Sequence, residues 1–245
     1  MKSLILCEGK TDAILLSYYM CHMYGWNPLS SKDRKKLKSL SIKADTPTQN
    51  ADWYQRNNDY LLICSVGGNS NFGNFFRDKI KDALINTSAF QKIIILTDRD
   101  NHTEEEIADF FYHDFDQFFP KLVNNHWQTF EYSNAFNEAE SIQLLLVIIP
   151  QNQQGALETV LLNAISENPY DKFIVDNCKS FVESMRPHAS KYISTDRLQL
   201  KSWLNTTWAI QSPEKVFDFI NEQINSVSWE SSSTLKECFS KLSEI

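Results

Sequence analysis

Short apolar runs alternate with amphipathic stretches along the first half of the chain. The apolar runs at residues 3–7, 60–66 and 92–97 predict strands, and the stretches at 11–24 and 72–85 predict helices between them. Strands that are apolar throughout are typical of parallel sheets with both faces covered. The order of these elements therefore predicts an α/β fold with a mostly parallel sheet flanked by helices.

The second half of the chain changes from strands to helices. Apolar runs at residues 127–132 and 142–149 predict two strands that pair around 134–137, and a helix begins after Gly155. We predict an α/β core over residues 1–167 and a C-terminal helical appendage over 168–245, packed on the core. Further helices are predicted from Thr103 and at residues 171–185, 195–204, 213–224 and 234–242, and a mobile polar insertion at 30–50.

Composition and charge narrow the class of protein. The chain has 245 residues, an apolar fraction of 42% and a formal net charge of −7. Its longest purely apolar run, residues 144–149, is far shorter than the roughly 20 residues that cross a bilayer. The five cysteines form no CxxC pair, and the N-terminus has no signal-peptide pattern, so we expect a cytoplasmic protein without a membrane partner. The acidic balance disfavours a protein that coats nucleic acid through a basic surface, but it is compatible with a metal-dependent nuclease.

Two acidic clusters directly follow predicted strands. Glu8 and Gly9 follow the first strand, and Asp98 and Asp100 follow the third. Ligands of open α/β sheets bind at the carboxyl ends of strands, and Gly9 allows a ligand to approach the backbone closely. Two carboxylates on one face of a strand repel each other unless a cation separates them, which favours a divalent metal. In the alternative interpretation, Asp98 ends a strand and Asp100 starts a turn.

These residues resemble the Toprim superfamily, the catalytic domain shared by topoisomerases, bacterial primases and several nucleases. Its pattern is an apolar strand that ends in Glu-Gly and a later strand that ends in Asp-x-Asp, matched here by Glu8 and its glycine and by Asp98 and Asp100. Between them, Gly67 and Gly68 look like the glycine turn after the second Toprim strand, a candidate substrate contact. The resemblance covers roughly the first 100 residues and implies a Toprim-like, Rossmann-like fold.

Within this superfamily the chain is most similar to nucleases of the overcoming-lysogenization-defect type and their small stand-alone relatives. Residues 150–158 are similar to a segment that supplies an extra metal-binding Glu, which makes Glu158 a candidate ligand, although the helix dipole also favours Glu in a first turn. That branch tends to carry a late basic residue near the metal, a role that Lys201 or Lys191 could fill, and Lys201 shares a helix face with Arg197. These nucleases usually carry an ATPase domain. The chain has no G-x-x-x-x-G-K-[ST] motif, so ATP-driven control would require a separate protein partner.

The resemblance implies cleavage of phosphodiester bonds in nucleic acid, with DNA preferred to RNA, and Mg2+ or Mn2+ as the cofactor. Glu8 would be the general acid or base, and Asp98 and Asp100 would hold the metal. Asp12 could bind metal or cap the helix that begins there, and Lys10 could contact a phosphate. Two other interpretations stay open: a primase-like nucleotidyl transfer, and a catalytically inactive Toprim module that binds nucleic acid or a partner protein.

Overall fold

The structure is a computed structural model that describes residues 1–34, 37, 42–214 and 229–245. The described chain forms two compact units. The first contains Met1–Thr97, His102–Ile148 and Lys241–Ile245, and the second contains Asp98–Asn101 and Ile149–Ser240. The helix predicted at residues 213–224 falls largely outside the described residues, as does part of the predicted insertion at 30–50.

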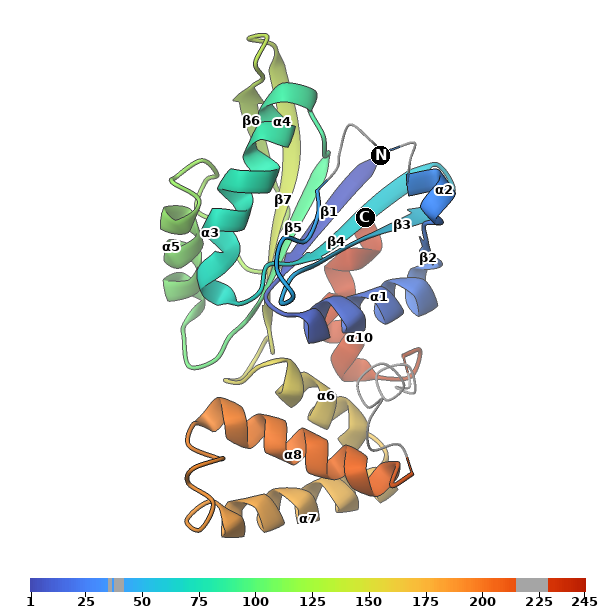
Figure 1. The fold of residues 1–245 in the computed structure, drawn as a ribbon, viewed down its shortest axis with the longest axis vertical. Helices are drawn as coiled ribbons and strands as arrows, with labels where there is room; N and C mark the ends of the chain where they lie inside the picture. The colour runs from blue at the N-terminus through green and yellow to red at the C-terminus, as the bar shows by residue number, and fades with distance from the viewer. Residues whose placement is uncertain (35–36, 38–41, 215–228) are drawn as a thin grey trace. The chain divides into compact units, whose positions relative to one another are not determined.

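Three parallel strands form the centre of a seven-stranded sheet in the order β2-β3-β4-β1-β5-β7-β6 (Figure 1). β1 (Lys2–Cys7) pairs in parallel with β4 (Asp59–Ser65) on one side and with β5 (Lys92–Asp98) on the other. These are the three strands that the apolar runs predict, because each is buried along most of its length.

Antiparallel strands complete the sheet at both margins. On one side, β6 (Gln128–Ser133) and β7 (Ala139–Ile149) form the predicted hairpin. On the other, β3 (Asn50–Arg56) pairs with β4, and the two-residue strand β2 (Asn27–Pro28) pairs with β3. The sheet is therefore mixed, with a parallel centre, and β2 and β3 were missed by the sequence analysis.

Helices flank this sheet because alternate strand residues point to opposite faces. Leu4 and Leu6 of β1 join a core that includes aromatic side chains such as Phe72, Phe76 and Phe111. That core is built with α3 (Phe72–Phe75), the π-helical turn Phe76–Lys81, α4 (Asp82–Thr87) and α5 (Glu104–Asp114). α5 begins with the predicted capping box, in which the Thr103 side chain accepts from the Glu106 amide. The other helices of this unit are α1 (Lys10–Tyr24), which contacts β4, the short α2 (Ser31–Arg34) and the 3-10 turn Asn69–Asn71.

The second unit is built from helices. α6 (Leu157–Ser166), α7 (Pro169–Met185) and α8 (Asp196–Gln211) contact one another, and α10 (Ser233–Phe239) contacts α6. Side chains of Asn168, Thr195 and Ser232 cap α7, α8 and α10. No helix in the described parts of the chain is long and apolar enough to cross a membrane.

Candidate functional site

Glu8 lies at the carboxyl end of β1 and is almost completely buried, with 2% of its surface exposed. The Thr97 hydroxyl, at the end of the neighbouring strand β5, donates to Glu8 Oε1 at 2.8 Å. The backbone amides of Gly67 and Gly68 both donate to the Glu8 carbonyl at 2.9 Å. The glycine turn after β4 therefore fixes the backbone of Glu8, and Thr97 orients its carboxylate.

Gly67 is suited to this turn by its backbone. Its φ of +88° is strained for residues with a side chain, and an added Cβ would lie 2.8 Å from Thr48 Oγ1. The Asn71 amide group donates to the Gly67 carbonyl at 2.9 Å, which holds the turn from the other side. The predicted glycine turn is present, and its hydrogen bonds join it to the Glu8 carbonyl and to the Asn71 side chain.

Asp12 caps helix α1. Gly9 is the N-cap residue, and its amide donates to Asp12 Oδ2 at 2.6 Å. The helix begins at Lys10, slightly earlier than the sequence predicts, and Lys10 itself is exposed in the first turn. Of the two roles open for Asp12, the structure shows the capping interaction.

The second unit gathers the other predicted acidic residues. Asp98 has a side chain that is 4% exposed, and its two oxygens have different partners. Oδ1 accepts from the backbone amide of Leu157, the first residue of α6, at 2.9 Å. Oδ2 lies 3.3 Å from Arg197 Nη2 on α8. Asp98 therefore caps one helix and forms an ion pair with another.

Asp100 does not continue the strand. Its φ is +48°, and its backbone exchanges hydrogen bonds with Gly155 at 2.7 and 3.0 Å. The expectation that Asp98 and Asp100 share a face of one extended strand is therefore wrong, since β5 ends at Asp98. The two carboxylates still converge, because Asp100 Oδ2 lies 3.9 Å from Nη1 of the same Arg197 guanidinium.

Glu158 is held by the other basic residue of α8. Its side chain is 9% exposed, and Lys201 Nζ donates to Glu158 Oε1 at 2.7 Å. Arg197 and Lys201 are four residues apart, so they lie on one face of α8. Two cations of one helix thus pair with three acidic side chains.

Sequence analysis placed Lys201 near the acidic residues but gave Arg197 no role in the site. The spacing of four residues places Arg197 on the same helix face as Lys201, but it does not show that this face meets the acidic side chains. The remaining cation in the acidic motif, Arg99, holds the end of β7 in place. Its Nε donates to the Pro150 carbonyl at 2.9 Å, and its backbone amide donates to the Ile149 carbonyl at 2.7 Å.

The predicted metal ligands show a limited geometry. Among the residues that the structure describes, no three or more His, Cys, Asp or Glu side chains are grouped as a ready metal site. Mg2+ is often bound through only one or two carboxylates, together with waters and substrate phosphates. Asp98 and Asp100 meet that smaller requirement, because both are arranged around a single cationic group.

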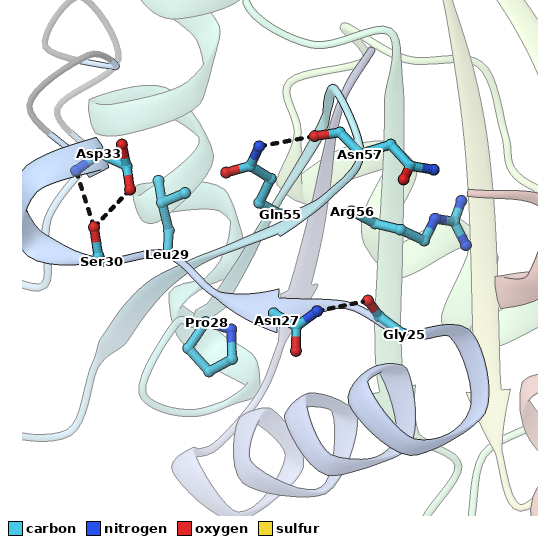
Figure 2. A pocket seen from close by; sticks show the side chains of 9 residues that line it. All are labelled: Gly25, Asn27, Pro28, Leu29, Ser30, Asp33, Gln55, Arg56 and Asn57. Carbon is cyan, nitrogen blue, oxygen red and sulfur yellow. Dashed lines mark hydrogen bonds between the residues drawn. The ribbon is translucent and has the colours of Figure 1, made fainter.

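A separate cavity of about 390 Å3 lies in the first unit, beside the short strand β2 (Figure 2). Its polar groups largely satisfy one another. Asp33 accepts from the Ser30 hydroxyl at 2.6 Å, and the Gln55 amide group donates to the Asn57 carbonyl at 2.8 Å (Figure 2). None of the predicted site residues lines this cavity.

The fold and these residues define a mixed α/β protein with acidic side chains after its central parallel strands. The chain belongs to the family described as "Protein of unknown function (DUF3226)", whose model matches residues 2–243. Among solved structures it is similar to the crystal structure of hypothetical protein PH0156 from Pyrococcus horikoshii OT3. That match has 12% sequence identity, covers 98% of each chain and has a TM-score of 0.48. No curated protein matches the chain.

Proposed function

We propose that this chain is a Mg2+- or Mn2+-dependent nuclease that cleaves phosphodiester bonds in DNA through a site of Toprim type. The observation that carries the proposal is a buried carboxylate, Glu8, directly after the central strand β1. β1 runs parallel to β5, which ends at Asp98. The Toprim resemblance implies this arrangement, in which a Glu-Gly pair follows one parallel strand and an Asp-x-Asp motif follows its neighbour.

The residues of the second unit fit a divalent metal of this kind. Asp98 and Asp100 already share one cation, the guanidinium of Arg197, so the same pair of oxygens can face a metal. When bound, the metal would neutralise charge on the phosphoryl oxygens of the substrate. Glu158 is the candidate for a second ion, with Lys201 as the cation that now neutralises it.

The proton transfers are assigned to Glu8. As a carboxylate, it can accept a proton from the attacking water, and as an acid it can return one to the leaving oxygen. The Thr97 hydroxyl occupies Glu8 Oε1 and fixes the orientation of the side chain, which general acid–base catalysis requires. Arg197 and Lys201, about half exposed, supply positive charge for the phosphate backbone of the substrate.

A cleavage assay with a matched variant tests this function. Supercoiled plasmid and labelled DNA and RNA oligonucleotides are incubated with Mg2+ or Mn2+ and with wild type, Glu8→Gln or Glu183→Gln. Glu183 is an exposed glutamate on α7, so its variant controls for the loss of one negative charge. We expect metal-dependent DNA cleavage that falls by at least about 100-fold in Glu8→Gln and is unchanged in Glu183→Gln. Equal cleavage by both variants, or none by wild type with either metal, would contradict the proposal.

One observation favours a second candidate, a module that binds nucleic acid without cutting it. Arg197 and Lys201 pair with Asp98, Asp100 and Glu158, so the acidic side chains have cationic partners that belong to the protein itself. A gel-shift assay of the same oligonucleotides in EDTA distinguishes the two functions. Binding in EDTA, with no cleavage after metal is restored, supports the second candidate.

A further inference from the structure

The outer face of helix α7 carries an apolar stripe that the proposed nuclease function does not use. Tyr170, Phe173, Phe181 and Met185 are 77%, 72%, 57% and 39% exposed. The helix packs into its own unit through three other side chains, which are buried: Val175, Cys178 and Val182. Monomeric proteins seldom leave several large side chains exposed on one helix face without a partner.

The four side chains form one stripe and not a scatter. At about 100° per residue, they fall within a sector of roughly 120°, with Asn177 near its middle. The centre of that sector is turned by roughly 110° from the direction of the buried side chains. The stripe is therefore a second apolar face of the helix, distinct from the face that packs against α6 and α8.

The stripe is symmetric about Asn177. Phe173 precedes Asn177 by four residues and Phe181 follows it by four, while Tyr170 and Met185 lie seven and eight residues away. A two-fold axis through Asn177 therefore places Phe173 of one copy against Phe181 of the other, twice. It also places Tyr170 against Met185, twice, so that all four side chains of each copy find apolar partners.

We infer that α7 is a dimerisation surface on which a second copy of this chain packs in antiparallel orientation. The charge of the helix supports a protein partner over a nucleic acid, because its acidic residues Asp171, Asp176 and Glu183 outnumber Lys172 and Lys179. A polar residue at the centre of an apolar helix seam fixes register, which is the role that this arrangement gives Asn177.

The area of the stripe is sufficient for a reversible dimer. Aromatic side chains bury about 150–250 Å² each, so the exposed parts of the three aromatic residues, together with Met185, supply roughly 500 Å² per copy. The total of roughly 1,000 Å² reaches the lower limit for a specific interface. We therefore expect association in the micromolar range, in exchange with a folded monomer.

Sedimentation velocity from about 1 µM to about 200 µM tests the inference. Wild type is expected to change from monomer to dimer across this range, and Phe173→Asp to stay monomeric. Phe136→Asp is the matched control, since Phe136 is 74% exposed and lies outside the stripe, and it should dimerise as wild type does. Circular dichroism and thermal melting establish that each variant is folded.

A cysteine variant tests the orientation independently. Asn177→Cys, at the two-fold axis, is expected to form a disulfide-linked dimer on mild oxidation, whereas Glu183→Cys, on the far side of α7, should not. Wild type and its five native cysteines supply the background. The inference is overturned if wild type is monomeric throughout the range, or if Phe173→Asp dimerises as strongly as Phe136→Asp.

Discussion

Replacing Arg197 with glutamine separates the two roles that the structure gives its guanidinium. Arg197 pairs with Asp98 and Asp100 at 3.3 and 3.9 Å. If these carboxylates also hold a divalent metal, the guanidinium competes with the metal for the same oxygens. The Arg197→Gln variant should therefore be less stable without metal, and it should bind metal more tightly.

The size of the stability loss follows from the exposure of the partners. Removing one member of a fully buried ion pair costs about 3–5 kcal/mol. The Asp98 side chain is 4% exposed but Arg197 is 46% exposed, so solvent screens part of this loss and we expect about 1–3 kcal/mol. For a chain of this length that corresponds to a fall in Tm of roughly 3–10 °C.

Metal should restore the stability of Arg197→Gln more than that of wild type. A ligand at about 100 times its Kd adds about 2.7 kcal/mol. Removal of the competing cation should tighten Mn2+ binding by about tenfold, or about 1.4 kcal/mol. Isothermal titration with Mn2+ measures the affinity, and thermal melting with and without Mn2+ measures the stabilisation.

The control for this experiment is Lys172→Gln in the same unit. Lys172 pairs with Asp176 at 2.5 Å, and both side chains are more than half exposed, so the loss should stay below about 1 kcal/mol. If Arg197→Gln melts with wild type and binds Mn2+ no more tightly, then neither role of Arg197 is correct. A lower Tm with unchanged affinity would leave the ion pair as a purely structural contact.

Two further predictions concern local structure, one at the glycine turn that holds Glu8 and one at the C-terminal end of helix α6. Gly67→Ala should lose about 1–3 kcal/mol in denaturant unfolding, because of its φ of +88° and the contact with Thr48. Gly25→Ala, with a φ of +70° but no atom within 4 Å of the added Cβ, should lose only about 1 kcal/mol, and equal losses would contradict the role of the contact. Glu167 accepts from Thr234 and Ser233; burial raises its pKa, but these hydrogen bonds outweigh burial and lower the pKa from 4.5. Because the side chain is exposed, solvent screens its interactions, and we expect a stabilisation below about 1 kcal/mol that is present above pH 4.5 and is lost as the pH falls through the lowered pKa. The difference between wild type and Glu167→Gln in urea unfolding should therefore vanish in acid, and a difference that persists there would refute this.

The parallel centre of the sheet was predictable because its strands are buried on both faces and therefore apolar along their length. β3 was missed for the opposite reason. Its sequence, Asn50–Arg56, has only two buried residues, Trp53 and Tyr54, and five polar or small ones that face partly exposed surroundings. β2 contains two residues, and pairing with β3 alone defines it. Such marginal strands form through tertiary hydrogen bonds that no local pattern encodes.

The candidate site was predictable where a motif directly follows a strand, and less so where distant segments meet. Glu8 could be placed because the end of a parallel strand fixes its position. The left-handed backbone of Asp100 could not, since it depends on hydrogen bonds to Gly155, 55 residues later in the sequence. Arg197 lies 99 residues from Asp98. Its partner is selected by the packing of α8, and a lone sequence reveals only that two basic residues share a helix face.

The burial of the Glu8 and Asp98 carboxylates is a physical argument that supports the proposed function. A carboxylate loses hydration when it leaves water, and its partners in the folded protein recover only part of that free energy. The sheet does not need a charge after β1, because a neutral side chain could accept the Thr97 hydrogen bond and a serine or threonine could cap α6 in place of Asp98. Sites that bind metal and transfer protons do need such charges, and proteins retain them there at the expense of stability. Glu8 and Asp98 are both buried, and the proposed function would give each charge a reason to be retained.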